Sequence, residues 1–191
     1  MMPVYRSVVA FFLLASAAHA VPWKVDATHS HLDFSGTQGG EAFHGGFKTF
    51  TPVIAFDPAH PETGKIDVTV DIASAFIDND KDKNEALPTD DWFAVKKFPS
   101  AEFHSTAIHS AARLKSAGPA FDVDGTLTLR GITKPVTLTF ELIDKGNGLF
   151  EARGSTQLKR NDFGVGQGKE WASDQWVAYP VAVTFTVVAR K

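Results

Sequence analysis

Two-residue alternation between apolar and polar side chains runs through residues 121–142 and restricts this stretch to β-structure. The apolar positions share one parity before Arg130-Gly131 and the other after it: Phe121, Val123, Leu127 and Leu129, then Val136, Leu138, Phe140 and Leu142. Successive side chains of a strand point to opposite faces, so each half has one dry face and one wet face. Gly131 supplies the positive φ that a tight turn requires. The pattern therefore predicts two antiparallel strands with a short connection.

The same alternation recurs along most of the chain and predicts about eight strands. The other segments that show it lie at residues 23–25 and 31–35, which look like two pieces of one strand, and at residues 43–56, 66–72, 101–103, 150–158 and 181–189. Within 43–56 the apolar positions change parity, and Gly45-Gly46 is the expected site of a bulge or bend. Residues 78–98 do not alternate, and Asn79 or Asp80 is the expected N-cap of a short helix there. We therefore expect one all-β domain, an antiparallel barrel or sandwich with one short helical insertion.

Composition provides for a large core and excludes several classes of protein. Hydrophobic residues make up 43% of the chain, which contains 16 Phe, enough to fill a core without disulfides. The formal net charge of −3 gives no electrostatic reason to expect nucleic acid or an anionic membrane surface as a partner. There is no Cys, which excludes disulfides, thiolate metal sites and a Cys nucleophile.

Residues 1–20 have the features of a cleavable signal peptide. Arg6 precedes an apolar run at residues 8–15, and Ala18-His19-Ala20 is a small-x-small cleavage site. The run is too short to span a bilayer, so we do not expect an integral membrane protein. We expect the mature chain, residues 21–191, to begin at Val21 and to reside in the periplasm.

Several groups of polar residues are of the types found in active or metal sites, and each has a simpler explanation. His29 and His31 would share one face of a strand, but no third metal ligand has a matching spacing. Ser30 would point to the face opposite His29 and so would not share a hydrogen bond with it. Asp90-Asp91 is suited to capping a helix, and Gly164–Gly168 lacks the Lys-Ser or Lys-Thr pair that follows a phosphate-binding loop. We therefore expect neither an enzyme nor a metal site.

The apolar side of the predicted strands is the remaining candidate site. The side chains expected to point into a barrel are Phe34, Phe50, Phe56, Val70, Phe103, Leu127, Leu129 and Phe140. Leu87, Trp92 and Phe93 of the helical insertion are expected to close one end. Periodicity alone favours a packed core over a cavity, although either interior requires the same apolar face.

Six short motifs occur in a recognisable order along the chain. The central one is GTLTLRGITKPV at Gly125–Val136, and the others lie at Asp26–Phe34, Gly46–Phe50, Phe56–Pro58, Trp92–Pro99 and Asn161–Gly164. Together they resemble the YceI-like family of exported proteins that bind lipids and polyisoprenoids. The resemblance covers nearly all of the chain after Ala20. It implies a lipocalin-like barrel with an elongated apolar interior, and it reverses the preference for a packed core.

Three segments refine this resemblance. Phe163–Trp171 resembles the subset of the family found with diheme b-type cytochromes, which implies a quinone-like ligand and a transient contact with a membrane cytochrome. Gly36–Gly39 replaces a Lys-His pair that many relatives carry, which puts any head-group contact made by that pair in doubt. His29 matches a His-Ser element of the family, and we expect it to be a structural hydrogen-bonding residue at a barrel end.

The expected function is that of a periplasmic carrier holding a polyisoprenoid, an isoprenoid quinone or a fatty-acyl lipid, with no other cofactor. A buried ten-carbon segment contributes roughly 8 kcal/mol before the ordering costs of association, whereas a head-group hydrogen bond adds about 1 kcal/mol. Chain length should therefore dominate affinity. The alternative is a packed β-domain that acts in envelope stress or adhesion through its outer surface. Whether the protein forms a homodimer stays open in both cases.

Overall fold

The computed structural model describes residues 22–111 and 118–191, most of which lie in ten strands. The strands are β1 (Lys24–Gln38), β2 (Glu41–Phe47), β3 (Phe50–Ala55), β4 (Lys65–Asp71), β5 (Ala75–Ile77), β6 (Ser100–Ser110), β7 (Ala120–Leu129), β8 (Ile132–Gly146), β9 (Leu149–Lys159) and β10 (Pro180–Arg190). One helix, α1 (Lys81–Ala86), and short 3-10 turns at Pro61–Thr63, Ile72–Ser74 and Arg160–Phe163 complete the described elements. The predicted all-β class with one short helical insertion is confirmed, while the predicted signal peptide lies outside the described residues.

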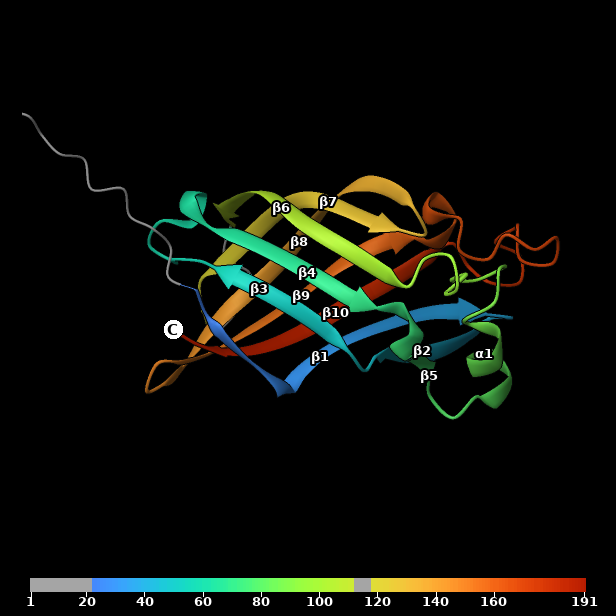
Figure 1. Ribbon diagram of the computed structural model, residues 1–191, viewed down its shortest axis with the longest axis horizontal. Coiled ribbons are helices and arrows are strands. Elements are labelled where there is room, and N and C mark those ends of the chain that lie inside the picture. The colour runs from blue at the N-terminus through green and yellow to red at the C-terminus, as the bar shows by residue number, and fades with distance from the viewer. Residues whose placement is uncertain (1–21, 112–117) are drawn as a thin grey trace, which may run out of the picture.

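All ten strands form one antiparallel sheet that curls into an elongated, lipocalin-like barrel (Figure 1). The strand order is β3-β4-β6-β7-β8-β9-β10-β1-β2-β5. The edge strand β3 returns to the start of β1, where the Trp23 N–H donates to the Ile54 carbonyl at 2.9 Å and Pro22 forms a bridge with Ala55. The sheet therefore encloses an interior toward which the apolar parity of each strand points.

The expected count of about eight strands is two too low, for two local reasons. Segment 43–56 is divided at Lys48-Thr49 into β2, which pairs with β1, and β3, which pairs with β4. β5 is only three residues long, too short to show an alternation. The expected bulge at Gly45-Gly46 is also wrong, because both glycines keep regular register with β1. A Cβ on Gly45 would lie 2.9 Å from Phe34 Cζ, so glycine permits close packing there rather than a bend.

The predicted ribbon at residues 121–142 is confirmed as the hairpin β7–β8. Leu129 pairs with Ile132, and the two turn residues between them, Arg130 and Gly131, have φ values of 52° and 74°. Two consecutive positive φ angles match the right-handed twist of a hairpin, and Gly131 adopts its angle without steric cost. The register of β8 with β9 begins only at Thr139, so the earlier part of β8 tolerates Pro135, which has no N–H to donate.

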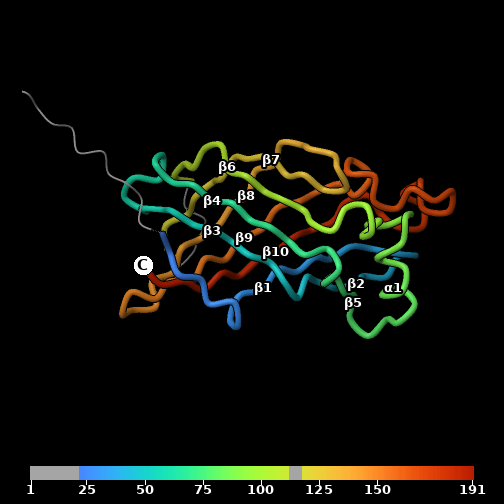
Figure 2. Tube along the Cα trace, in the orientation of Figure 1, coloured from blue at the N-terminus to red at the C-terminus, as the bar shows by residue number. Residues whose placement is uncertain are grey.

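The two ends of the barrel differ. At one end Trp23, Phe56, Phe121, Phe140 and Phe150 pack together, with Trp23 Nε1 donating to the Phe56 carbonyl at 2.7 Å. The Phe56 and Phe121 rings meet edge to face with centroids 5.0 Å apart, a favourable aromatic geometry. The opposite end carries α1 and the long connection after β9, which both lie at the right-hand end of the barrel in Figure 2. We call the first the packed end and the second the α1 end.

Candidate functional site

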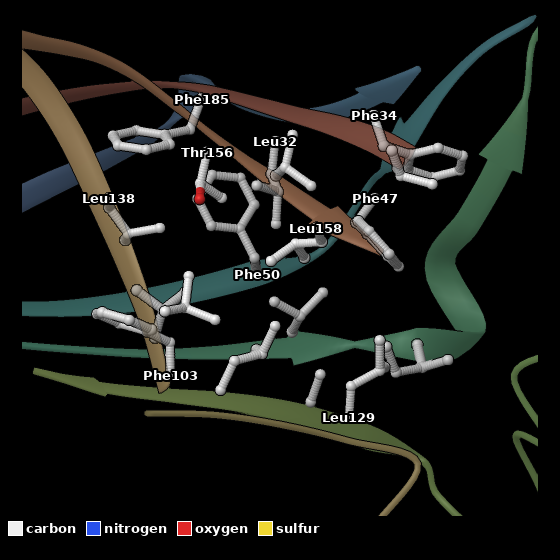
Figure 3. A pocket seen from close by; sticks show the side chains of 18 of the residues that line it. Leu32, Phe34, Phe47, Phe50, Phe103, Leu129, Leu138, Thr156, Leu158 and Phe185 are labelled. Atoms are coloured by element: carbon white, nitrogen blue, oxygen red, sulfur yellow. The ribbon is translucent and has the colours of Figure 1, made fainter. Parts of the chain in front are cut away.

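An apolar cavity of about 500 Å³ occupies the interior of the barrel. All ten strands contribute to its lining, and the labelled side chains of Figure 3, among them Leu32, Phe50, Leu138 and Phe185, converge on a shared space. Protein interiors rarely contain voids much larger than a water molecule, so this volume is not a packing defect. It falls within the range of about 300–1,000 Å³ typical of small-molecule sites.

Every apolar residue predicted from the sequence as a site residue borders this cavity. The eleven are Phe34, Phe50, Phe56, Val70, Leu87, Trp92, Phe93, Phe103, Leu127, Leu129 and Phe140. Leu127 and Leu129 point inward and yet are only partly buried, as expected for side chains that face open space rather than one another. The structure thus brings the predicted set together around one space, while their contact with a ligand stays a prediction.

Sequence reasoning left out more lining residues than it included, and several of them carry the same signal. Val181, Val183 and Phe185 of β10 and Leu158 of β9 lie on the apolar parity of their strands and border the cavity. Leu32 lies two residues before Phe34 on the same face of β1. Extending the parity rule to every strand identifies all of these residues.

Polar side chains are few in the lining and, apart from one, come from the α1 end or its connections. They are Gln38, Asp82, Lys83, Thr156 and Arg160. Thr156 faces the middle of the cavity, but its hydroxyl donates to the Thr137 carbonyl at 2.9 Å and so does not need a ligand partner. The cavity is therefore apolar along most of its length, with its charged groups gathered near α1.

Residues 88–98 and 160–179, which we call the cap, meet at the α1 end. The N–H groups of Gly166 and Gln167 donate to the Asp91 carbonyl at 2.8 and 2.9 Å, and the rings of Trp92 and Trp171 lie 5.5 Å apart. Arg130, at the tip of the β7–β8 hairpin, donates to the carbonyls of Asp90 and Trp92, which ties the hairpin to the cap. Leu87 and Phe93 are buried beneath these segments, so the three residues predicted to close one end all lie there.

Arg160 organises the second half of the cap. It is only 5% exposed, and its guanidinium donates to six backbone carbonyls at 2.6–3.2 Å: those of Val165, Gly166, Trp171, Ser173, Val177 and Ala178. Burial lowers the pKa of Arg160, although a guanidinium stays protonated in proteins. The carbonyl dipoles therefore take the place of a carboxylate partner.

Nothing in the sequence indicates this role for Arg160. Gly164–Gly168, which lacks the residues that follow a phosphate-binding loop, belongs to the connection from β9 to β10. Arg160 nevertheless holds that connection in place, with Val165 and Val177 buried below it. No sequence motif around Arg160 indicates its partners. Its partners are backbone carbonyls, and only the folded path of the loop brings them to the guanidinium.

The Asp26–Ser30 segment of β1 forms a bulge rather than a reactive centre. The register between β1 and β10 shifts between Asp26 and His31, and His29 Nδ1 lies 2.9 Å from Asp26 Oδ2, which lowers the pKa of Asp26. The Ser30 hydroxyl donates to the Asp26 carbonyl at 2.6 Å and accepts from the Val188 N–H at 3.0 Å. The Ser30 hydroxyl thus links β1 to β10 where the bulge interrupts their backbone hydrogen bonds. The bulge separates the two pieces expected for this strand, residues 23–25 and 31–35. His29 makes a hydrogen bond as expected, but it lies within β1 rather than at a barrel end.

Within residues 22–111 and 118–191, no three or more His, Asp or Glu side chains are grouped so as to hold a metal ion. In the same part of the chain, no helix is long and apolar enough to cross a membrane.

Comparison with known proteins connects this cavity to a family. Residues 23–189 match the model of the YceI-like domain. A UPF0312 protein of Pseudomonas savastanoi pv. phaseolicola is 35% identical over 161 residues, which cover 80% of this chain and 81% of the relative.

Solved structures show the same fold. The crystal structure of Burkholderia cenocepacia BcnA superposes with a TM-score of 0.77 at 32% identity, covering 86% of this chain and 99% of BcnA. A polyisoprenoid-binding domain from Saccharophagus degradans, implicated in plant cell wall breakdown, superposes with a TM-score of 0.65. It is 15% identical, with 88% of this chain and 97% of that domain covered, so it supports the fold alone.

Proposed function

This chain belongs to the YceI-like family, and on that premise we propose that it is a binding protein that carries one long apolar lipid inside its barrel. The cavity is the observation that carries the proposal. An apolar space of about 500 Å³ that extends to α1 can bury a flexible apolar chain and offers few partners to a polar solute. Each buried methylene would contribute about 0.8 kcal/mol, so the tail of the ligand would supply most of its affinity.

The ligand class we propose is a polyisoprenoid, an isoprenoid quinone or a long-chain acyl lipid. The match to the YceI-like family, whose resemblance implies binding of lipids and polyisoprenoids, supports the first and the last of these. The segment Phe163–Trp171, which resembles that of relatives found with diheme cytochromes, supports the second, and here it forms part of the cap. A transient contact with a membrane cytochrome would follow from a quinone ligand.

Export to the periplasm completes the proposal. A lipid that must cross an aqueous compartment needs its apolar chain covered, which is what an enclosing barrel provides. The signal sequence at residues 1–20 supports this location. Intact-mass analysis of the exported protein should give a chain that begins at Val21, and a retained apolar segment would contradict both the cleavage and the proposed compartment.

The alternative of a packed domain that works through its outer surface has no support in the interior. A solid core requires the inward side chains to fill the barrel, whereas here they surround open space.

The proposal is tested by quenching of tryptophan fluorescence. Trp23, Trp92 and Trp171 all border the cavity, so a quinone with a decyl tail should quench the delipidated protein saturably. A quinone with the same head and no tail should quench only by collision, without saturation. Absence of saturable quenching by the tailed quinone and by a neutral fluorescent polyene would rule out a lipid-carrying barrel.

A further inference from the structure

A second, polar hollow of about 410 Å³ adjoins the cavity between β2 and α1. We call it the polar cleft; its lining comprises Ala42, Phe43, His44, Ile77, Asp78, Asn79, Asp80 and Lys83. Phe43, Ile77 and Lys83 line both the cleft and the apolar cavity, so the two spaces meet there. His44 and Asp78 are exposed, and the cleft therefore faces solvent at its outer side. A ligand whose tail fills the cavity would have its polar end at this junction.

The side chains that line the junction carry more negative than positive charge. Asp78, Asp80 and Asp82 are three carboxylates beside the single ammonium of Lys83. That ammonium is already paired with Asp80, whose Oδ1 also accepts the Lys83 N–H at 2.9 Å as the N-cap of α1. These hydrogen bonds hold the pKa of Asp80 below its usual range. The Lys83 charge is thus neutralised within the protein, and Asp78 and Asp82 remain to repel an anion.

Arg160, the other cation of the cavity lining, offers no donor to a ligand. A guanidinium has five N–H bonds, and those of Arg160 are directed at six backbone carbonyls of the cap. A bound carboxylate or phosphate would have to displace part of this network. An arginine that recognises a carboxylate or phosphate normally donates two parallel N–H bonds to it, and both N–H groups must be free to do so.

Amide and imidazole side chains complete the junction. Asn79 and His44 line the polar cleft, and Gln38 lines the cavity itself. Amide and imidazole side chains can both donate and accept hydrogen bonds, which suits a hydroxyl, a ketone or an amide.

From this arrangement we propose that the polar cleft holds the head of the ligand and selects an uncharged head over an anionic one. The proposal rests on the proposed function and narrows its ligand class to long-chain alcohols, quinones and amides, against free fatty acids and prenyl phosphates. A phosphate in the cleft would face the negative charges of Asp78 and Asp82, and because the cleft faces solvent this repulsion should be strongest at low ionic strength.

The test compares two ligands with the same 20-carbon chain, geranylgeraniol and geranylgeranyl phosphate. Each displaces the decyl-tailed quinone from delipidated protein at low ionic strength and a pH near 8. We expect the alcohol to bind about tenfold more tightly than the phosphate, or better. Raising the salt concentration should reduce this ratio, because screening weakens the repulsion.

Substitutions test whether the carboxylates of the junction cause the preference for an uncharged head group. Asp78→Asn combined with Asp82→Asn should improve phosphate binding at least about threefold and leave alcohol binding unchanged, since only the charge is removed. Glu62→Gln, an exposed carboxylate in the turn Pro61–Thr63, is the matched control and should leave the ratio unchanged. Circular dichroism confirms that each variant keeps its β-structure.

The outcomes separate the two proposals. Equal or tighter binding of the phosphate overturns the selection while the carrier function stands. A ratio that the Asp78/Asp82 double variant leaves unchanged overturns the assignment of the polar cleft. Failure of both the tailed quinone and the neutral fluorescent polyene to bind overturns the carrier function, and the head-group proposal with it.

Discussion

At the scale of single residues, Leu129 distinguishes a cavity from a core. It lies on the inward face of β7 and borders the open space in Figure 3. In a packed core, Leu129→Trp would cost about 1–3 kcal/mol, because the larger ring overfills the interior. Here we expect the free energy of unfolding of the delipidated protein to change by less than about 1 kcal/mol, while the affinity for the tailed quinone falls. Denaturant titration and fluorescence quenching measure the two quantities.

Phe121→Trp is the matched control for that experiment. Phe121 lies on the same strand and the same face as Leu129, but it is 1% exposed in the packed end. The larger ring should destabilise the protein there by about 1–3 kcal/mol. Equal destabilisation by both substitutions would mean that the interior around Leu129 is as full as that around Phe121.

Arg160 provides the second prediction at this scale. Arg160→Met leaves six carbonyls of the cap without their donor, and we expect a loss of about 3 kcal/mol or more in the free energy of unfolding. Arg160→Lys should recover little of the lost stability, because an ammonium has three N–H donors and lacks the planar geometry of a guanidinium. Hydrogen exchange should speed up across residues 164–179 in both variants. Arg190→Met, which removes an exposed arginine bonded to the Asn147 carbonyl, should leave that exchange unchanged.

At the scale of elements, the cap should govern ligand exchange. Trp92 and Phe93 border the cavity, and Trp92 also packs on Trp171 across the two halves of the cap. Replacing both with Ala should accelerate release of the tailed quinone while the strands keep their pairing. Stopped-flow displacement measures the release rate, and circular dichroism checks the strands.

Trp176→Ala is the control for the cap. Trp176 belongs to the same segment, but its side chain is 55% exposed. We expect its removal to leave the release rate close to that of the unmodified protein. If the Trp92/Phe93 double variant releases the quinone no faster than Trp176→Ala does, these aromatics are ordinary packing residues.

The elements also show which parts of the fold a sequence can predict. The β7–β8 hairpin was predictable because alternation and Gly131 act locally. The N-cap of α1 was predictable for the same reason, and Asp80 does accept the Lys83 N–H. The division between β2 and β3 was not predictable, because the sequence Lys48-Thr49, where it occurs, does not resemble a turn. Gly45-Gly46 does resemble a turn, but these glycines allow close packing within β2 instead.

At the scale of the whole molecule, the sequence predicts which side chains face inward but not what they enclose. Phe34, Phe103 and Phe140 have the same alternation whether they meet across a core or surround a cavity. The diameter of the barrel decides whether these side chains fill the interior or surround a cavity. That diameter depends on how the sheet curls and on where β3 meets β1. The family resemblance supplied that information, while the cap and the polar cleft, assembled from distant segments, were beyond local patterns.

Native mass spectrometry of protein exported to a periplasm tests the central claim most directly. A barrel that carries one long apolar lipid should appear as the chain beginning at Val21 plus one non-covalent adduct, removed by organic solvent and restored by a tailed quinone. The adduct should have the mass of a long-chain isoprenoid or acyl compound. Protein that carries no adduct as isolated and takes up none after incubation with the quinone would contradict the account.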